Sequence, residues 1–331
     1  MKNRLDAMPE EVMKHILKDC DFFDFMALRN TCTHTRRMVN LINPDPKLEF
    51  LSIHWMSTNM ILHFGFVNSE KCIRSSFENQ DGGCMVTGTN EGWAARKFVA
   101  DTSAERMFLQ GLKILLPLLK NQRTPLERFY VERDVGVAAS FQETVVPLFR
   151  DLDIQVRSAE VLLIIHEGIN IMPMLSLASP DGLTELRIVS RKGELPALDL
   201  SEALESEQWR SARHFDLLYT RPSTPQCFLR CQSSFMQIDE VTPEYVSMLK
   251  ETFRAVPPTF GHFCLCVPGL RYDLTQIERA ISETGGRDKT WYFSTANPDF
   301  VLKINIVEYQ NYINFFRVAS RSLGSAHVIL D

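Results

Sequence analysis

The sequence lacks any apolar run near the ~20 residues that a helix needs to cross a bilayer. Its longest apolar stretches, 161–165 and 114–119, suit a buried strand and a core helix. Charged residues interrupt the N-terminus, which has no apolar signal region, and there is no Asn-x-Ser/Thr sequon. None of the eight cysteines belongs to a CxxC pair, a pattern typical of reduced thiols. These absences predict a soluble intracellular protein, cytoplasmic, nuclear or both, that binds no membrane.

The sequence also lacks a large excess of charge of one sign. The 331 residues carry a net charge of −5, and through Asp45 seven Lys/Arg balance seven Asp/Glu. A nucleic-acid binder usually shows a basic excess, so we expect no nucleic-acid partner. Hydrophobic content of 45% and charged content of 23% are ordinary for a globular protein. The length suffices for two or three structural units.

Recognisable catalytic motifs are missing too. His166-Glu167 is not followed by the second histidine of a metalloprotease motif, and the sequence has no GxSxG elbow, no P-loop and no GxGxxG turn. Cys72 and Cys84 are candidate thiols without a base at a recognisable spacing. We therefore expect no catalytic residue and no cofactor. The enzymatic alternative is an unrecognised hydrolase that uses a Cys/His pair.

The remaining candidates for metal ligands are histidine and cysteine side chains. His262, Cys264 and Cys266 share one face of an expected strand, and Cys227 and Cys231 lie four residues apart. Neighbouring residues on one face of a strand are too splayed to form most of a tetrahedral zinc site. We expect half-buried side chains that pack on neighbouring strands instead of a metal site.

What the sequence does contain is a run of three short amphipathic segments at its N-terminus. In the first, Pro9 fits the opening helical turn, and Val12, Ile16 and Leu17 share one face. A second helix is expected to begin at Asp24, which is a good N-cap. The third runs over about 33–40 and ends before two prolines. Such a short piece cannot bury all its apolar residues alone, which favours a contact with another protein.

These segments resemble an F-box. The resemblance is carried by three blocks: Met8-Pro9-Glu10-Glu11-Val12 with Ile16-Leu17, Phe25-Met26-Ala27-Leu28-Arg29 with Cys32, and Arg36-Arg37-Met38-Val39. Met8 stands where leucine is typical, a volume-conserving change. The resemblance covers residues 1–45 and implies docking to the Skp-type adaptor of a cullin–RING ubiquitin ligase. The residues expected to make that contact are Pro9, Val12, Ile16, Leu17, Leu28 and Cys32. The alternative is a helical subdomain that packs on the rest of the chain.

Residues 46–100 read as a β-rich connecting region. Two β-rich runs within 48–67 flank a polar turn and predict an antiparallel hairpin. The stretch 68–92 is polar and contains Asp81-Gly82-Gly83, so we expect loops there with a short strand at 84–86. A helix is expected to begin at a Ser103 cap and to be kinked or restarted at Pro117.

Residues 101–331 alternate short strands with helices. The strand centres are separated by irregular steps of about 20–30 residues, which suits a leucine-rich-repeat-like α/β solenoid. The expected strands are 129–132, 161–166, 186–189, 214–219, 235–238, 262–267, 291–293, 301–307 and 312–318. The expected helices are 141–150, about 171–178, 201–212 and 243–255.

This second part resembles the FTH-type C-terminal domain that accompanies F-boxes in a nematode-type family. The blocks that carry the resemblance, in order, are Leu126–Val131, Leu183–Ile188, the 242–252 helix with His262–Leu265, Trp291–Phe293 and Val301–Ile306. The family's C-terminal domain is implied to bind the protein that will be ubiquitinated.

The open face of the expected sheet is the candidate surface for the target protein. Successive strand residues face opposite ways, so Phe263, Leu265 and Val267 are expected to face the helices. On the same alternation, the outer face carries the candidate target-binding residues Glu132, Arg187, Asp216, Gln237 and Cys264. The alternatives are a merely solvated face and a register that is off by one residue in some strands.

The sequence therefore predicts a multi-domain α+β protein: a three-helix F-box, a β-hairpin region and a leucine-rich-repeat-like solenoid. Its predicted function is that of a non-enzymatic substrate receptor in a Skp–cullin–F-box ubiquitin ligase, with the Skp-type adaptor and a target protein as partners. The alternative from another class is an interaction scaffold that uses the same repeat surface without recruiting a ligase.

Overall fold

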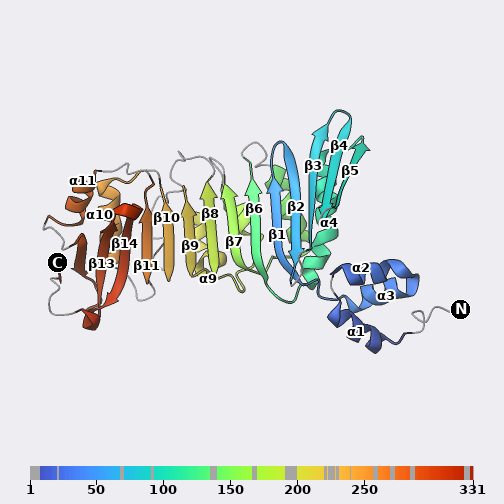
Figure 1. Ribbon diagram of the computed structural model, residues 1–331, viewed down its shortest axis with the longest axis horizontal. Helices are drawn as coiled ribbons and strands as arrows, with labels where there is room; N and C mark the ends of the chain where they lie inside the picture. The colour runs from blue at the N-terminus through green and yellow to red at the C-terminus, as the bar shows by residue number, and fades with distance from the viewer. Residues whose placement is uncertain are drawn as a thin grey trace. The chain divides into compact units, whose positions relative to one another are not determined.

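The computed structural model forms two compact units, one of residues 1–159 with 177–179 and one of 160–176 with 180–331. It describes residues 8–331 apart from 21, 68–70, 91–92, 135–139, 166–169, 191–199, 220–221, 223–227, 229–230, 239, 256–259, 269–272, 284–287, 324–328 and 331. Of Asp19, Phe22, Phe25 and Trp93 it describes the backbone alone. Figure 1 labels most of the helices and strands of both units.

The first unit opens with three helices, α1 (Glu10–Asp19), α2 (Phe22–Thr31) and α3 (Thr33–Ile42). Cys32 caps α3 in a capping box, because its Sγ accepts from the Thr35 N–H at 3.5 Å and the Thr35 hydroxyl accepts from the Cys32 N–H at 3.2 Å. The α3 helix ends at Asn43, which adopts the left-handed conformation with φ 53°. The expected N-cap at Asp24 is wrong, since α2 begins at Phe22 and Asp24 lies within its first turn.

Six strands of the first unit follow in the sheet order β6-β1-β2-β3-β4-β5, with β5 at the end of the sheet. Strands β1 (Leu48–Trp55), β2 (Asn59–Phe66), β3 (Cys72–Gln80), β4 (Gly83–Asn90) and β5 (Trp93–Ala100) pair antiparallel in sequence order. Strand β6 (Leu126–Arg133) pairs parallel with β1. The predicted hairpin at 48–67 is confirmed as β1 and β2.

The loops expected over 68–92 are wrong, because β3 and β4 occupy most of that stretch. Gly82, at φ +77°, lies in the tight turn that joins β3 to β4, and a residue without a Cβ adopts this conformation without strain. One face of these strands is rich in Ser, Thr, Arg and Glu, so the apolar alternation that marks a strand is weak there.

Helix α4 (Ala104–Asn121) lies against β2, β3 and β4 (Figure 1). Ser103 caps it as expected, accepting from the Arg106 N–H at 3.2 Å. The Phe108 ring meets Trp55 of β1 edge to face, with 5.1 Å between ring centroids. Pro117 lies inside the helix and does not restart it. A π-turn at Phe141–Val145 leads into α6 (Val146–Asp151), which matches the expected helix 141–150.

The second unit contains a mixed sheet in the order β15-β12-β13-β14-β11-β10-β9-β8-β7. Strands β7 (Ser158–Ile165), β8 (Glu185–Ser190), β9 (His214–Leu218), β10 (Ser233–Gln237) and β11 (His262–Cys266) are parallel. Strands β14 (Tyr312–Ala319), β13 (Phe300–Val307) and β12 (Thr290–Ser294) continue the sheet antiparallel, and β15 (Ile329–Leu330) pairs parallel with β12. Each of these strands except the short β15 overlaps a predicted one.

Helices alternate with the strands of this unit: α7 (Met172–Leu175), α8 (Ser201–Glu205), α9 (Glu207–Ser211), α10 (Pro243–Arg254) and α11 (Leu274–Ile281). The chain is thus a mixed α/β protein in which N-terminal helices precede sheets with interspersed helices. The leucine-rich-repeat-like solenoid stays a prediction.

Helices cover one face of the parallel strands through aromatic contacts. Trp209 of α9 packs on Phe215 of β9 with 4.5 Å between ring centroids, and Phe253 of α10 lies 5.3 Å from Phe263 of β11. The Tyr245 hydroxyl of α10 donates to the Met236 sulfur of β10 at 3.7 Å. The residues at the alternate positions of these strands therefore face the other side of the sheet.

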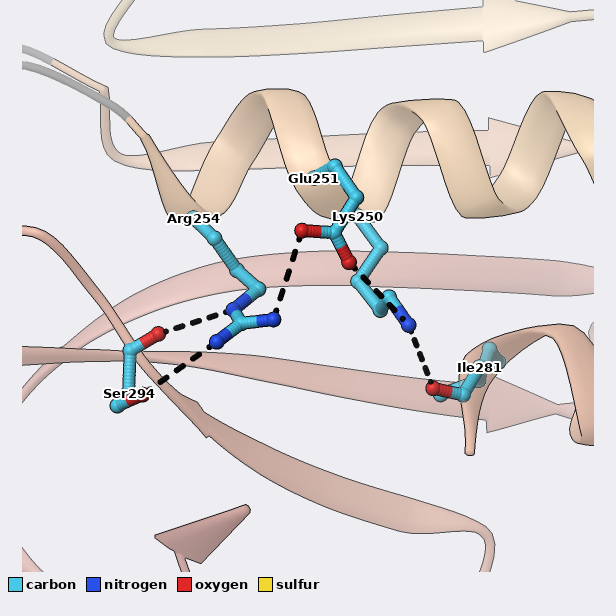
Figure 2. A network of polar contacts seen from close by, with 5 residues as sticks. All are labelled: Lys250, Glu251, Arg254, Ile281 and Ser294. Carbon is cyan, nitrogen blue, oxygen red and sulfur yellow. Dashed lines mark hydrogen bonds and ion pairs between the residues drawn. The ribbon is translucent and has the colours of Figure 1, made fainter. Parts of the chain in front are cut away.

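Two basic side chains of α10 tie it to α11 and β12 (Figure 2). Lys250 donates from Nζ to the Ile281 carbonyl, at the end of α11, at 3.1 Å. Arg254 donates from Nε to the Ser294 carbonyl of β12 at 3.2 Å, and Glu251 forms ion pairs with both basic residues at 3.4 Å. Both cations also lie over the Phe293 ring. Lys250 thus donates to the Ile281 carbonyl, which the end of α11 leaves without a partner in the helix.

Replacing Lys250 with methionine is expected to destabilise the protein by roughly 1–2 kcal/mol, because a charged donor to a helix C-terminus is lost while the apolar stem stays. Urea unfolding followed by tryptophan fluorescence measures the change, since Trp291 of β12 is buried. The same replacement at Lys113, exposed on α4, is the matched control and is expected to be near neutral. Equal stability of the two variants would show that the Lys250 contacts drawn in Figure 2 do not stabilise the protein.

Candidate docking surfaces

Helix α1 carries two apolar stripes. Met13 and Leu17, one turn apart, are 1% and 3% exposed, and α1 packs against α3, whose buried residues are Thr35, Met38 and Val39. Val12 and Ile16, also one turn apart, are 46% and 38% exposed. Pro9, the N-cap residue of α1, has extended dihedral angles, lies three residues before Val12 and is exposed. The second stripe is apolar surface that the three helices leave uncovered.

The six residues predicted to contact an adaptor thus occupy three kinds of position. Pro9, Val12 and Ile16 form the exposed stripe, which we call the α1 stripe. Leu28 and Cys32 are half-buried, and the Cys32 sulfur is engaged in the α3 cap. Leu17 lies inside the helical unit.

One exposed apolar side chain among these helices was not predicted. Leu41, near the end of α3, is 63% exposed. It falls outside the face on which Thr35, Met38 and Val39 are buried, and that departure from the apolar periodicity was the available signal. The helices therefore expose apolar surface on α3 as well as on α1.

The model of the F-box domain matches residues 5–47, which include all three helices. The chain therefore contains an F-box domain, and the predicted F-box is confirmed. No curated protein and no solved structure matches the chain. The FTH-type resemblance of the C-terminal part stays a prediction. Within the residues that the structure describes, no helix is long and apolar enough to cross a membrane.

The second unit has a charged cluster on the strand face opposite its helices. Arg187 of β8 is at its centre: its Nη1 donates to Glu160 of β7 at 3.2 Å, and its Nε lies 3.2 Å from Asp216 of β9. Glu185, two residues earlier on β8, is 3.8 Å from the same nitrogen. His214 of β9 lies beside the cluster, with its Nδ1 2.7 Å from the Ser233 hydroxyl.

Burial and repulsion shift the acid–base equilibria of this cluster. Burial and the neighbouring Glu160 and Asp216 raise the pKa of Glu185. Burial likewise raises the pKa of Asp216, against the opposing effect of Arg187. For Arg187, burial alone would lower the pKa, but the hydrogen bond to Glu160 and the three carboxylates raise it. The Arg187 guanidinium stays charged, whereas the charged forms of the Glu185 and Asp216 carboxylates are disfavoured in the folded protein.

The structure brings two of the five predicted target-binding residues, Arg187 and Asp216, into direct contact. Gln237 is half-buried on β10, at the same level as Leu218 of the neighbouring β9. The other two predicted residues, Cys264 and Glu132, are buried. Cys264 of β11 is 7% exposed, and its register partner on β14, Asn314, is buried as well.

Glu132 of β6, in the first unit, is 2% exposed. Its Oε2 lies 2.7 Å from Nδ1 of His54 and accepts from the Tyr130 hydroxyl at 3.1 Å. The expectation that Glu132 and Cys264 lie on an exposed surface is therefore wrong. The two side chains that contact Glu132 are Tyr130, on the same strand, and His54, on the neighbouring β1. The alternation rule gives the face of a strand residue and does not count such contacts.

Among the described cysteines of the second unit, Cys231 and Cys264 are buried and Cys266 is half-buried. Burial raises the pKa of Cys264 to about 12 and that of Cys231 to about 12, and it raises the pKa of Cys266 too. A thiol with so high a pKa is protonated at neutral pH and is a poor nucleophile or metal ligand. The described part of the chain has no group of three or more His, Cys, Asp or Glu that could hold a metal ion. His166 and Cys227, weighed above, lie outside the described residues.

Glu160 and Glu185 belong to the charged cluster and were not predicted. Each lies at a strand start, where the apolar pattern gives no hint of its neighbours. The register joins them, because Glu160 pairs with Glu185 and Arg187 pairs with Asp216 across adjacent parallel strands. Only the pairing of strands separated by 20 or more residues in sequence brings the four side chains together.

Proposed function

We propose that this chain is the substrate-receptor subunit of a Skp–cullin–F-box ubiquitin ligase. The F-box match supports the ligase role, and the α1 stripe supports the place of contact with a Skp-type adaptor. The chain would supply no chemistry of its own. It would act by proximity, holding a target protein near the ubiquitin carrier that other subunits recruit. Such a receptor would work inside the cell, in the cytoplasm, the nucleus or both.

The observation that carries this proposal is the exposure of Val12 and Ile16 beside the buried Met13 and Leu17. A helix needs one apolar stripe to pack on its own domain. A second, adjacent stripe gains stability only when another molecule covers it. Full burial of a Val or Ile side chain contributes about 1.5–3 kcal/mol, so these two side chains suit the centre of a protein interface.

The second unit would hold the target protein. Residues 101–331, which include this unit, are proposed to be an FTH-type, leucine-rich-repeat-like domain, on the sequence blocks quoted above. Its parallel strands have one face covered by helices and an opposite face that carries Arg187, Asp216 and Gln237. We propose this opposite face as the target surface.

Co-purification with a Skp-type adaptor tests the adaptor contact. Replacing Ile16 with aspartate is expected to weaken adaptor binding at least ~100-fold, because an unpaired carboxylate buried in an apolar contact costs several kcal/mol. Ile114, 75% exposed on α4, offers a matched control. The Ile114→Asp variant makes the same change on another surface and is expected to bind like the wild type.

Two outcomes would contradict the proposal. A wild-type chain that does not bind the adaptor would favour the interaction scaffold, with the F-box as a structural element. A folded Ile16→Asp variant that binds as tightly as the wild type would place the contact elsewhere than the α1 stripe.

A further inference from the structure

The parallel strands β7–β10 have one face without a helix among the described residues. Phe215 and Met236 face α9 and α10, as described above. The alternate residues of β9, which are His214, Asp216 and Leu218, face the other side of the sheet and are partly or fully exposed. Figure 1 shows the ribbons of these strands side by side.

The register arranges this face in three rows that cross the strands. The first row is Glu160, Glu185, His214 and Ser233, and the second is Leu162, Arg187, Asp216 and Phe235. The third is Ile164, Val189, Leu218 and Gln237. Neighbouring strands are about 4.8 Å apart, and alternate residues along a strand about 6.6 Å. A charged patch thus adjoins a row of three half-buried aliphatic side chains.

The charges of the patch do not balance. Glu160, Glu185 and Asp216 contribute three carboxylates, and Arg187 contributes one guanidinium, which contacts all three. These four side chains therefore carry a formal charge of −2. A like-charged segment would be repelled from it, whereas a segment with lysine or arginine would neutralise it.

The flanks of the patch favour the same kind of ligand. Phe235 is the register partner of Asp216, and its ring meets Tyr312 edge to face. An aromatic ring beside a carboxylate offers a second favourable contact to an ammonium or guanidinium group. Ile164, Val189 and Leu218 on the adjoining row suit the apolar side chains of the same segment.

We propose that this face, the β7–β10 face, binds an extended segment of the target protein in which lysine or arginine residues stand next to aliphatic ones. The proposal rests on the receptor function proposed above, and it assigns the chemistry of the target that this receptor selects. The carboxylates take the basic side chains, and the aliphatic row takes the apolar ones.

The electrostatics of the free protein support this assignment, because the charged carboxylates of the patch lower the stability of the fold. The pKa values of Glu185 and Asp216 are raised by burial and by repulsion from nearby carboxylates. A carboxyl whose pKa is higher in the folded state than in the unfolded state destabilises the fold once the pH exceeds its ordinary value. Such a cost is expected where residues serve binding rather than folding.

The experiment uses the full chain and a fluorescent synthetic peptide of alternating arginine and valine residues with a single glycine between each, so that an extended peptide presents both side chains on one face. A matched peptide carries citrulline, the neutral analogue of arginine, at every arginine position. We expect the arginine peptide to bind, and the Glu185→Gln/Asp216→Asn double variant to bind it roughly tenfold more weakly, since two partly exposed charge contacts are lost. Fluorescence polarisation measures both affinities.

The matched control is Glu205→Gln/Glu244→Gln, which changes the net charge equally at exposed positions on α8 and α10 and is expected to bind like the wild type. The single Glu185→Gln variant gives a milder change if the double variant does not fold. Equal binding of the citrulline and arginine peptides, or equal affinity of the two double variants, would overturn the proposal.

Adaptor co-purification separates this proposal from the function on which it rests. The Glu185→Gln/Asp216→Asn variant is expected to lose the peptide and keep the adaptor. Ile16→Asp is expected to lose the adaptor and keep the peptide. A wild-type chain that binds the peptide but no adaptor would overturn the receptor function while leaving the β7–β10 face as a site for basic segments.

Discussion

Replacing Leu17 with aspartate is expected to unfold the three helices of the F-box. Leu17 is 3% exposed, so the new carboxylate would lie without a partner among apolar side chains and cost several kcal/mol. An element of three ten-residue helices has little stability to lose. The neighbouring Ile16 is 38% exposed and is expected to tolerate the same replacement in the free protein.

Circular dichroism and limited proteolysis of the two variants make the comparison. We expect Leu17→Asp to lose helical signal and to be cleaved within residues 8–43, while Ile16→Asp keeps the wild-type spectrum and resists cleavage. Both variants are expected to lose the adaptor, one through unfolding and the other at the contact itself. A folded Leu17→Asp chain would show that the interior of the F-box is not where the structure places it.

Truncating Phe253 to alanine is expected to destabilise the second unit by about 3–5 kcal/mol, the usual result of deleting a buried ring. Phe253 of α10 is 2% exposed. Its ring stacks on Phe260 at 4.4 Å and lies 5.3 Å from both Phe263 and Phe315. Neighbours on two strands and a loop cannot all move inward, so a cavity remains.

Met248 on the same helix is the control, because it is 38% exposed. Met248→Ala removes a side chain of similar reach from the solvent side and is expected to change stability by less than ~0.5 kcal/mol. Chemical denaturation with Trp291 as the probe compares the two. A loss below ~1 kcal/mol for Phe253→Ala would mean that the aromatic cluster collapses around the missing ring.

The strands of the second unit could be predicted from sequence because helices cover one of their faces. That burial imposes a strict alternation, as in Leu186 and Ile188 against Arg187 and Val189. The F-box was predictable for another reason: its residues recur at fixed spacing along three short helices. In both cases local sequence and tertiary packing agree.

Other features depend on interactions that the local sequence does not show. Strands β3 and β4 have a polar face, and Asp81-Gly82 within a polar stretch predicts a loop, although the same pair also favours a tight hairpin. Helix α4 continues through Pro117 because Leu115, Leu116 and Leu119 are held in the core on both sides of it. The charged cluster around Arg187 requires the register of three strands, and only the folded structure supplies that register.

The place of β5 at the end of its sheet has a consequence for how copies of this chain meet. A terminal strand presents backbone donors and acceptors that can template the addition of a strand from another molecule. Along β5, Arg96 and Lys97 project into solvent, next to an exposed Phe98. Two copies aligned edge to edge would bring these cations together. Their repulsion therefore opposes polymerisation through the exposed backbone hydrogen-bonding groups of β5.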